Sequence, residues 1–521
     1  MNPAIREDLT YERTRSGFVR GFSFWDVFTF VVATPAASGI VYYSVASKAT
    51  FPGASFPLAF VFGIVLFLPV AMLLGATSSA VPRSGGIYVL ISRLLSPALG
   101  QVAAWLLFVA YGLCIGMFGY IVVGILGGIV GMSGKGSLDS LAAFLMSGTG
   151  KVLGACIWVG LLWLIFRMGG AWIRNLLRVT VFVPLVAILV AIVAFLAVGP
   201  AGAQKAFDAT WGQGAYGKVL TLAAQEGWSR VPFSLADTFA ALLVVIWAYT
   251  TLEAVNYAGS EVRNPKTNFL RGFVAGVLAV GLLYVLVAVG VYHCFGDFVS
   301  AYAYVAAKSA GSLKTIMPAI DPSIPFYATS VLPAMPALLV SVALLLWFFN
   351  SMPGVFLASS RLAYALAADG VFPRRMQDVD GKRGVPIWAT NATAGLGFLG
   401  ILLMSLDLTQ VLGVLNFCFL FVFWPYGLSA AILPFRAPEV FADCPFRKRI
   451  FGLPILSMLG AIVFLEGWYF LFLAVEGFGN WGALVTLVIL LLGLAVQLRY
   501  RRKHQVLGSD GEAVFRQIPL D

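Results

Sequence analysis

The stretch of sequence that decides the fold is residues 30–43, which read FVVATPAASGIVYY. It lies within an apolar run, 24–47, that is long enough to cross the roughly 30 Å of hydrocarbon in a bilayer. Pro35 removes a backbone donor there, and four small residues follow it. Unwound backbone at membrane depth is tolerated only where it lines a cavity or is buried in protein. The sequence predicts a broken membrane helix, and a proline kink with close packing of small residues is the alternative.

A second interruption occurs in residues 244–265, VVIWAYTTLEAVNYAGSEVRNP. Two threonines and a glutamate break an otherwise apolar helix. The same sequence would also fit an unbroken helix in which the threonine hydroxyls bond back to the helix backbone. The two interrupted segments lie five spans apart, so they enter the membrane from opposite sides. Matched breaks of this kind indicate an inverted repeat with a binding site at the midplane.

The composition places the whole chain in a bilayer. Of 521 residues, 60% are hydrophobic and 11% are charged, against about 25% charged in soluble domains. This excludes soluble enzymes, disordered chains and disulfide scaffolds, and predicts an all-α integral membrane protein. Twelve transmembrane helices are expected, at 24–47, 56–79, 98–131, 152–167, 177–199, 237–258, 272–295, 331–358, 387–405, 409–434, 452–475 and 482–498.

The basic residues predict the orientation. The net charge is +11, and 26 of the 34 Lys and Arg residues fall on the side that holds both termini. The positive-inside rule therefore predicts cytoplasmic termini in a multi-pass protein of the cell membrane, with no nucleic-acid partner. The expected parts are a cytoplasmic N-terminus (1–20), a first repeat of spans 1–5 (21–199), an extracellular loop (200–236), a second repeat of spans 6–10 (237–435), spans 11–12 (436–499) and a cytoplasmic tail (500–521).

The predicted breaks favour a small zwitterion as ligand. Half-helix N-termini offer free N–H groups to an anion, and exposed carbonyls suit an ammonium group or a cation. The five cysteines are scattered and the two histidines lie far apart, so we expect no metal site, no cofactor and no enzyme activity. A channel is disfavoured because no selectivity-filter repeat occurs. A sensor that shares the transporter core is an alternative that the sequence does not exclude.

Several motifs resemble those of the amino acid, polyamine and organocation (APC) superfamily of secondary transporters. They extend over about residues 20 to 435 and include the ends of predicted spans 1, 2, 6 and 8. The matching segments are Ser38-Gly39-Ile40, Pro82-Arg83-Ser84-Gly85-Gly86-Ile87-Tyr88, Trp247-Ala248-Tyr249, Gly259-Ser260-Glu261-Val262-Arg263-Asn264-Pro265, Ser360-Arg361 through Asp369-Gly370, Pro373 and Gly384-Val385-Pro386.

The resemblance implies a leucine-transporter-type core, with five plus five spans related by an inverted repeat and spans 11 and 12 peripheral. It implies that a substrate carboxylate is held by backbone N–H groups, here those of Ala37, Ser38, Gly39 and Ile40. It implies that carbonyls hold the ammonium group, here those of Ala33, Thr34, Ile246, Trp247 and Tyr249.

The chain also departs from the family pattern. Ala37 replaces a glycine, which narrows the carboxylate cradle. Thr251 and Leu252 stand where many members have a glycine and an aromatic gate. Without that aromatic side chain, Tyr249 or Trp247 would have to cover the bound substrate. The position of a span 5 lysine that replaces sodium in many members falls on about Pro184.

Two ways of coupling transport to an ion gradient are open. Ionisable groups inside the membrane are functional candidates by default. Glu253, just beyond the second break, is the candidate proton carrier, and a carboxylate bonded to unwound backbone is the alternative. Sodium would need oxygen ligands, for which Asn350 and Ser351 lie at a suitable depth, although ordinary interhelical hydrogen bonds explain them too. Glu466 lies outside the predicted core.

An inner gate is expected from charged residues at the cytoplasmic span ends. Arg83, Arg263 and Arg361 lie within the family motifs and would pair with Glu261 or Asp369, or they are plain positive-inside anchors. Depth alone suggests pocket walls at Tyr111, Cys114, Met117, Asn416 and Trp424.

Together these features predict a permease for neutral amino acids that works by alternating access, in uptake or exchange, with proton coupling. The alternatives are a polyamine or cationic amino acid transporter, in which Glu253 faces the ligand, and a sodium-coupled symporter.

Overall fold

The computed structural model describes residues 17–38, 44–132, 136–318, 320–406, 411–506 and 515. Within these residues, ten helical segments are long and apolar enough to cross a membrane. They are α4 (Phe56–Ala80), α6 (Pro97–Met132), α8 (Gly148–Met168), α9 (Gly170–Trp211), the stretch Leu235–Tyr257, α13 (Pro265–Phe295), α17 (Ala334–Ala368), α18 (Ile387–Ser405), the stretch Val414–Arg436 and the segment Ile455–Glu476.

Two further apolar helices are shorter than the other ten. They are Phe24–Pro35, within α2 (Phe24–Ser38), and Leu484–Tyr500, within α22 (Ile455–Val506). The expected number of twelve spans is reached only if both of these also cross, so that number stays a prediction.

The surface pattern of α9 explains why such helices need a bilayer. Large apolar side chains are exposed along one stripe at helical spacing, at positions 179, 183, 186, 190 and 193. The opposite face, with Leu177, Val181 and Ile188, is buried against the bundle. A helix that is apolar all round is typical of a membrane span, with one face on protein and the other on lipid.

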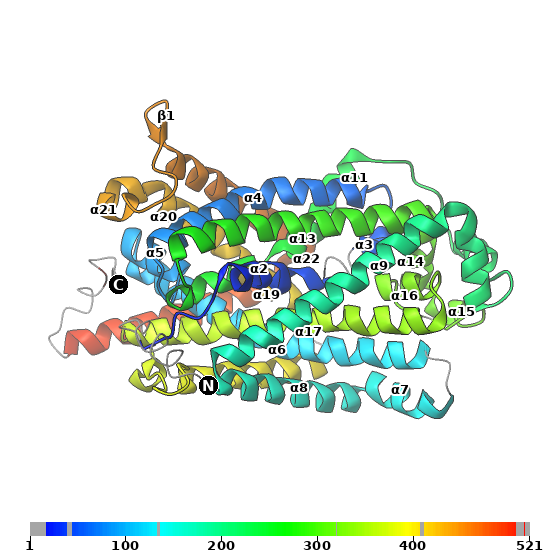
Figure 1. Cartoon of the computed structure of the whole chain (residues 1–521), viewed down its shortest axis with the longest axis horizontal. Helices are drawn as coiled ribbons and strands as arrows, with labels where there is room; N and C mark the ends of the chain where they lie inside the picture. The colour runs from blue at the N-terminus through cyan, green and yellow to red at the C-terminus, as the bar shows by residue number, and fades with distance from the viewer. Residues whose placement is uncertain are drawn as a thin grey trace, which may run out of the picture.

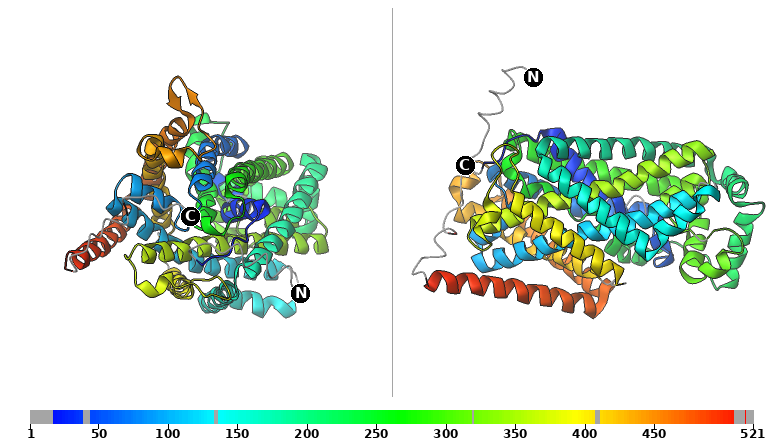
Figure 2. Two further views of the ribbon diagram at one scale, coloured as in Figure 1. Left: turned by 60° about the vertical axis from the view of Figure 1, so that its left-hand side comes forward. Right: turned by 90° about the horizontal axis from the view of Figure 1, so that it is seen from below.

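The helices lie roughly along one axis of the molecule (Figure 1). The start of α2, the C-terminal part of α22, and α5 (Ile87–Leu94) and α21 (Pro438–Phe441) lie at one end, which we call the terminal end (Figures 1 and 2). The other elements between spans toward this end are η5 (Gly259–Glu261), η6 (Arg374–Gln377), β1 (Arg449–Ile450) and β2 (Leu453–Pro454), the two strands pairing antiparallel.

Short helices also connect the spans toward the opposite end, the far end. They are α3 (Ser44–Ala46), η2 (Ser47–Ala49), η3 (Gly136–Leu138), α7 (Asp139–Met146), α10 (Ala215–Gln225), α14 (Phe298–Lys308), α15 (Ala310–Leu313) and α16 (Ile324–Thr329). The expected boundary between residues 199 and 200 falls inside α9, which continues to Trp211 past a kink at Gly199 with φ 57°.

The expected interruption near residue 250 is present. The stretch Leu235–Tyr257 consists of α11 (Leu235–Ala240), α12 (Leu242–Tyr249) and the 3-10 helix η4 (Leu252–Tyr257). Thr250 is extended, with ψ 162°, and Thr251 is left-handed, with φ 70°. A left-handed threonine is uncommon and costs about 1–3 kcal/mol, so the surrounding contacts hold it there.

The first expected interruption differs from the prediction. Helix α2 continues through Pro35 to Ser38, so the chain is still helical where the small residues were expected to unwind it. Proline lacks the N–H that would bond to the carbonyl four residues earlier, here that of Val31, and membrane helices tolerate this loss. The Tyr284 hydroxyl donates to the Pro35 carbonyl, in the last turn of α2, at 3.0 Å. Gly39 and Ile40 lie outside the described residues.

Candidate functional site

One tyrosine of α13 joins the C-terminal turns of α2 and α12. The Tyr284 hydroxyl lies within hydrogen-bonding distance of the Pro35 carbonyl of α2, at 3.0 Å, and of the Ala248 carbonyl of α12, at 2.7 Å. Its single hydrogen is shared between the two acceptors. Both helices approach this place with their C-terminal ends, where carbonyl groups carry partial negative charge. The arrangement therefore suits an ammonium group or a cation more than an anion.

Three of the five carbonyls expected to hold an ammonium group accept hydrogen bonds from residues 250 and 351. Ser351 donates to the Ala33 carbonyl at 3.4 Å. The Thr250 N–H lies 3.1 Å from the Ile246 carbonyl and 3.2 Å from that of Trp247. A carbonyl oxygen has two lone pairs. The Trp247 carbonyl also accepts from the Thr250 hydroxyl at 2.8 Å, so both of its lone pairs are used, whereas the Thr250 N–H takes one lone pair of the Ile246 carbonyl.

The neighbouring predicted residues are also placed. The Thr34 hydroxyl donates to Phe30 O of its own helix at 2.6 Å. Ala37 and Ser38 are helical in α2, where N–H groups bond to carbonyls four residues earlier instead of standing free. The carboxylate cradle therefore stays a prediction.

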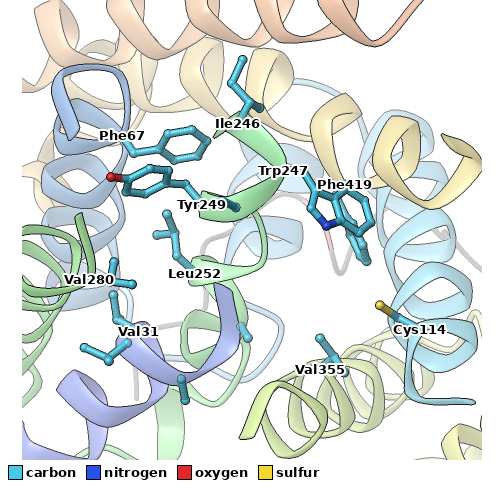
Figure 3. Packing of buried hydrophobic residues seen from close by; sticks show 14 of the residues in the cluster. Val31, Phe67, Cys114, Ile246, Trp247, Tyr249, Leu252, Val280, Val355 and Phe419 are labelled. Carbon is cyan, nitrogen blue, oxygen red and sulfur yellow. The ribbon is translucent and has the colours of Figure 1, made fainter. Parts of the chain in front are cut away.

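Two aromatic residues of α12 face different neighbours (Figure 3). Tyr249 stacks on Phe67 of α4, with ring centroids 5.2 Å apart, and its hydroxyl donates to the Phe60 carbonyl at 3.2 Å. Trp247 points to the other side, where its ring lies 6.3 Å from that of Phe419 of α19 (Val411–Phe421). The first ring is fixed against α4, so Trp247 is the aromatic residue that faces the space between α12 and α19.

Glu253 lies two residues after the left-handed Thr251 and is completely buried. Its Oε1 accepts a hydrogen bond from the Tyr111 hydroxyl of α6. Its Oε2 is buried and has no hydrogen-bond partner among the described residues. The ring of Tyr257 lies 5.9 Å from that of Tyr111. Its hydroxyl is also buried and has no hydrogen-bond partner within the described part of the chain. One oxygen of the carboxyl group is thus available to a proton, water or ligand.

The two residues considered for sodium link three helices. The Asn350 Oδ1 accepts from the Thr180 hydroxyl of α9 at 2.8 Å, whereas its Nδ2 has no partner in the described residues. Ser351 bonds to Ala33 of α2 as described above. Thr180 was not expected here, because nothing in its local sequence distinguishes it from a helix-packing threonine.

At the terminal end, Arg361 of α17 and Glu261 of η5 form a buried ion pair. The Nε lies 2.6 Å from Oε1 and the Nη2 lies 3.1 Å from Oε2, with side-chain exposures of 1% and 6%. The Phe18 ring covers the guanidinium at 4.9 Å. Bidentate pairing of this kind is strong and geometrically specific.

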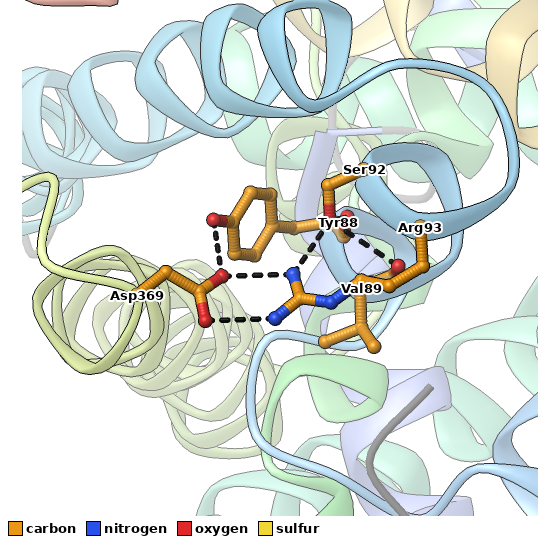
Figure 4. A network of polar contacts seen from close by, with 5 residues as sticks. All are labelled: Tyr88, Val89, Ser92, Arg93 and Asp369. Atoms are coloured by element: carbon orange, nitrogen blue, oxygen red, sulfur yellow. Dashed lines mark hydrogen bonds and ion pairs between the residues drawn. The ribbon is translucent and has the colours of Figure 1, made fainter. Parts of the chain in front are cut away.

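A second charged cluster lies nearby, around Asp369 (Figure 4). Its partner is Arg93 of α5, with Nη2 2.7 Å from Oδ1 and Nη1 2.8 Å from Oδ2. The Tyr88 hydroxyl also donates to Oδ2, and the Phe515 ring lies 4.9 Å from the guanidinium. Arg93 was not among the residues expected for the inner gate, because the local sequence marks it only as a basic residue that follows the second predicted span.

The remaining expected gate residues lie in a backbone junction. Arg263 donates its Nε–H to the Arg20 carbonyl at 2.8 Å, and its backbone N–H bonds to the Phe22 carbonyl. Gly259 packs so closely on Arg83 that a Cβ atom there would lie 2.7 Å from the Arg83 carbonyl oxygen. The motifs around residues 83 and 260, far apart in the sequence, therefore meet, as does the segment that precedes α2.

Two other buried polar groups deserve comparison with Glu253. Asn416 of α19 is fully buried, and neither atom of its amide has a partner among the residues described. Glu466 of α22 has a buried Oε2 that likewise has no partner in the described chain. The first lies one helical turn from Phe419, whereas the second is on the helix expected to lie outside the core.

Comparison with known proteins gives a consistent result. The family model described as amino acid permease matches residues 22–494. Similar proteins include the branched-chain amino acid permease BcaP of Bacillus subtilis, 25% identical over 54% of each chain, and the methylthioribose transporter of that organism, 22% identical over 54% of this chain and 55% of that one. The vacuolar cationic amino acid transporter 2 of Arabidopsis thaliana is 24% identical over 40% of this chain and 30% of its own length. The chain thus spans only about a third to a half of these relatives.

Proposed function

The chain belongs to the amino acid permease family, and from this premise we propose that it is a secondary active amino acid permease that works by alternating access. It is a multi-pass membrane protein with apolar helices of membrane length. The observation that carries the proposal is the interrupted helix at Thr250–Thr251, with incompletely satisfied polar groups around it. Interrupted helices at the midplane are typical of the substrate sites of secondary transporters.

A neutral amino acid is the proposed substrate. Glu253 is the only charged residue between Thr250 and Ala258, and the charged pairs at the terminal end are already neutralised by their partners. A zwitterion would place its ammonium group near the carbonyls of α2 and α12. The branched-chain permease among the relatives agrees with this choice.

A cationic amino acid is the second candidate, and the vacant Oε2 of Glu253 favours it. In that case this oxygen would pair with the charged substrate side chain, because a buried charge needs a partner. The relative named as a cationic amino acid transporter is consistent with this alternative. Polyamines would use the same oxygen.

For a neutral substrate, Glu253 is the proposed proton carrier. Its Tyr111 hydrogen bond holds one oxygen in place while the other stays available. Sodium coupling through Ala33, Asn350 and Ser351 is the alternative, since their oxygens lie between α2, α9 and α17.

The proposed topology has twelve spans, a five-plus-five inverted repeat and both termini in the cytoplasm, in the cell membrane. The terminal end would then be the cytoplasmic end. The buried pair of Arg361 and Glu261 would form the inner gate, with Asp369, Arg83 and Arg263 beside it, and this conformer would be closed toward the cytoplasm.

The test is uptake into proteoliposomes of leucine, arginine and a polyamine, at several external pH values and with or without sodium. We expect leucine uptake driven by an inward proton gradient. Glu253→Gln keeps the shape of the side chain and should make uptake independent of pH. Glu466→Gln is the matched control, because it also changes a carboxyl with a buried oxygen, and it should leave the pH dependence intact.

Each other outcome has a meaning. Uptake of arginine but not leucine, lost in Glu253→Gln, would replace the neutral substrate by a cationic one. Unchanged pH dependence in that variant would remove Glu253 as proton carrier. A folded protein that transports none of these compounds would contradict the proposed function.

A further inference from the structure

An apolar groove lies beside α6 and α18, toward the terminal end. Its volume is about 390 Å³, and its walls come from α6, α18 and the segment that follows α17. The lining residues are Trp105, Phe108, Phe372, Pro373, Met376, Ala392, Gly395 and Leu396.

Packing around the groove shows that it is a formed feature. The Phe372 ring makes edge contacts with Trp105, at 6.0 Å, and with Phe108, at 5.4 Å, so three aromatic rings support one another. On the facing helix, a Cβ atom built on Gly395 would meet no atom within 4 Å. The rings form one wall, and the missing side chain of Gly395 leaves space opposite them.

The groove adjoins a face of α18 that is suited to lipid. Phe398, Leu399 and Leu402 are exposed on this helix directly after the lining residues. The lining starts at Ala392, within two turns of the first residue of α18, Ile387. This depth corresponds to the boundary between hydrocarbon and headgroups, where aromatic residues such as Trp105 concentrate.

Two cations lie next to lining residues of the groove in the chain. Arg374 and Arg375 of η6 follow Pro373 and precede Met376, both of which line it. Both arginine side chains are exposed. Guanidinium groups bind phosphate oxygens well.

We propose that this groove binds an anionic phospholipid, with an acyl chain between the aromatic wall and α18 and with the phosphate at Arg374 and Arg375. The apolar walls match the acyl chain, and the two exposed arginines match the charge of the headgroup. The site lies outside the substrate path described above, so it does not depend on which amino acid is carried.

The test uses the full-length purified protein, stripped of lipid in detergent. Native mass spectrometry would measure the retention of dioleoyl phosphatidylglycerol and of the zwitterionic dioleoyl phosphatidylcholine. We expect one tightly retained phosphatidylglycerol and weaker retention of phosphatidylcholine. Arg374→Ala with Arg375→Ala should weaken retention of phosphatidylglycerol by roughly 30-fold, since each basic residue near an anionic headgroup contributes about fivefold. The matched control pair is Arg447→Ala with Lys448→Ala, two exposed adjacent cations in the segment after α21.

Filling the groove gives an independent variant. Gly395→Leu should place its side chain in the open space and displace the acyl chain, with no loss of stability, because leucine favours a helix more than glycine does. Gly160→Leu on α8 is the control, since a Cβ atom there also meets nothing within 4 Å. Full retention of phosphatidylglycerol in Gly395→Leu would overturn the proposal. So would equal retention of the two lipids by the wild-type protein, or an equal loss in the control pair of cations.

Discussion

The middle of the bundle and its terminal end treat buried polar groups in opposite ways. Around the interrupted helix, Glu253 Oε2, the Tyr257 hydroxyl and the Asn416 amide have no partners among the described residues. At the terminal end, Glu261 and Asp369 are each held by two hydrogen bonds from an arginine. Leaving buried groups unpaired costs stability. In the function proposed above, the first place would be available to a ligand or proton, and the second would be the gate.

The largest expected effect comes from breaking the closed end. Arg361→Ala leaves the buried Glu261 carboxylate without its cation and should cost about 3–5 kcal/mol in the free energy of unfolding. The control is Arg230→Ala, whose ion pair with Asp297 is exposed and should be worth at most about 1 kcal/mol. Thermal unfolding in the same detergent would compare the two. Equal effects would mean that burial does not distinguish these pairs.

An effect of opposite sign is expected in the middle of the bundle. Asn416→Leu removes two buried polar atoms that lack partners and should stabilise the protein by about 1–3 kcal/mol, while impairing uptake. Asn256 provides the control, because its amide is satisfied by the Ile87 N–H at 2.7 Å and by the Ser78 hydroxyl at 2.5 Å. Asn256→Leu should therefore destabilise. If both variants lose stability alike, the contrast between satisfied and unsatisfied amides fails.

The smallest effect is expected at the surface of the terminal end. The N–H groups of Arg383 and Lys382 donate to Asp380 and lower the pKa of its carboxyl group. This contribution to stability is present above the pKa of the unfolded chain, about 3.9, and is lost as pH falls through the lower folded pKa. Asp380→Asn should thus lower stability by no more than about 0.5 kcal/mol at pH 7. Melting curves of both proteins should converge below about pH 3, and a constant difference would point to another cause.

Much of the fold follows from local sequence. Blocks of apolar residues predict helices of membrane length, because a lipid-exposed backbone must bond within its own segment. The interruption at Thr250 was predictable, because exposing two threonines and a glutamate to lipid would cost free energy. The continuation of α2 through Pro35 to Ser38 was not predicted, and the contact of the Pro35 carbonyl with the Tyr284 hydroxyl, about 250 residues later, cannot be read from the local sequence.

The candidate site was less predictable than the fold. Sequence motifs pointed to Glu261, Arg361 and Asp369, but Arg93 looked like any other basic residue at a membrane boundary. Its identity as the partner of Asp369 depends on how α5 packs against α17. Thr180 and Tyr284 were missed for the same reason, because a hydroxyl on an apolar helix has no distinctive pattern until its acceptor is known.

The sequence by itself determined that the chain is a bundle of apolar helices with an interruption near residue 250. These properties depend on hydrophobicity and on backbone bonding, which act within one segment. Only the tertiary structure decided which arginine neutralises which carboxylate, which aromatic ring of α12 faces α19, and which buried polar atoms are left without partners. A hydrogen bond or ion pair between two helices depends on how the helices pack together, and the sequence of either helix alone does not specify it.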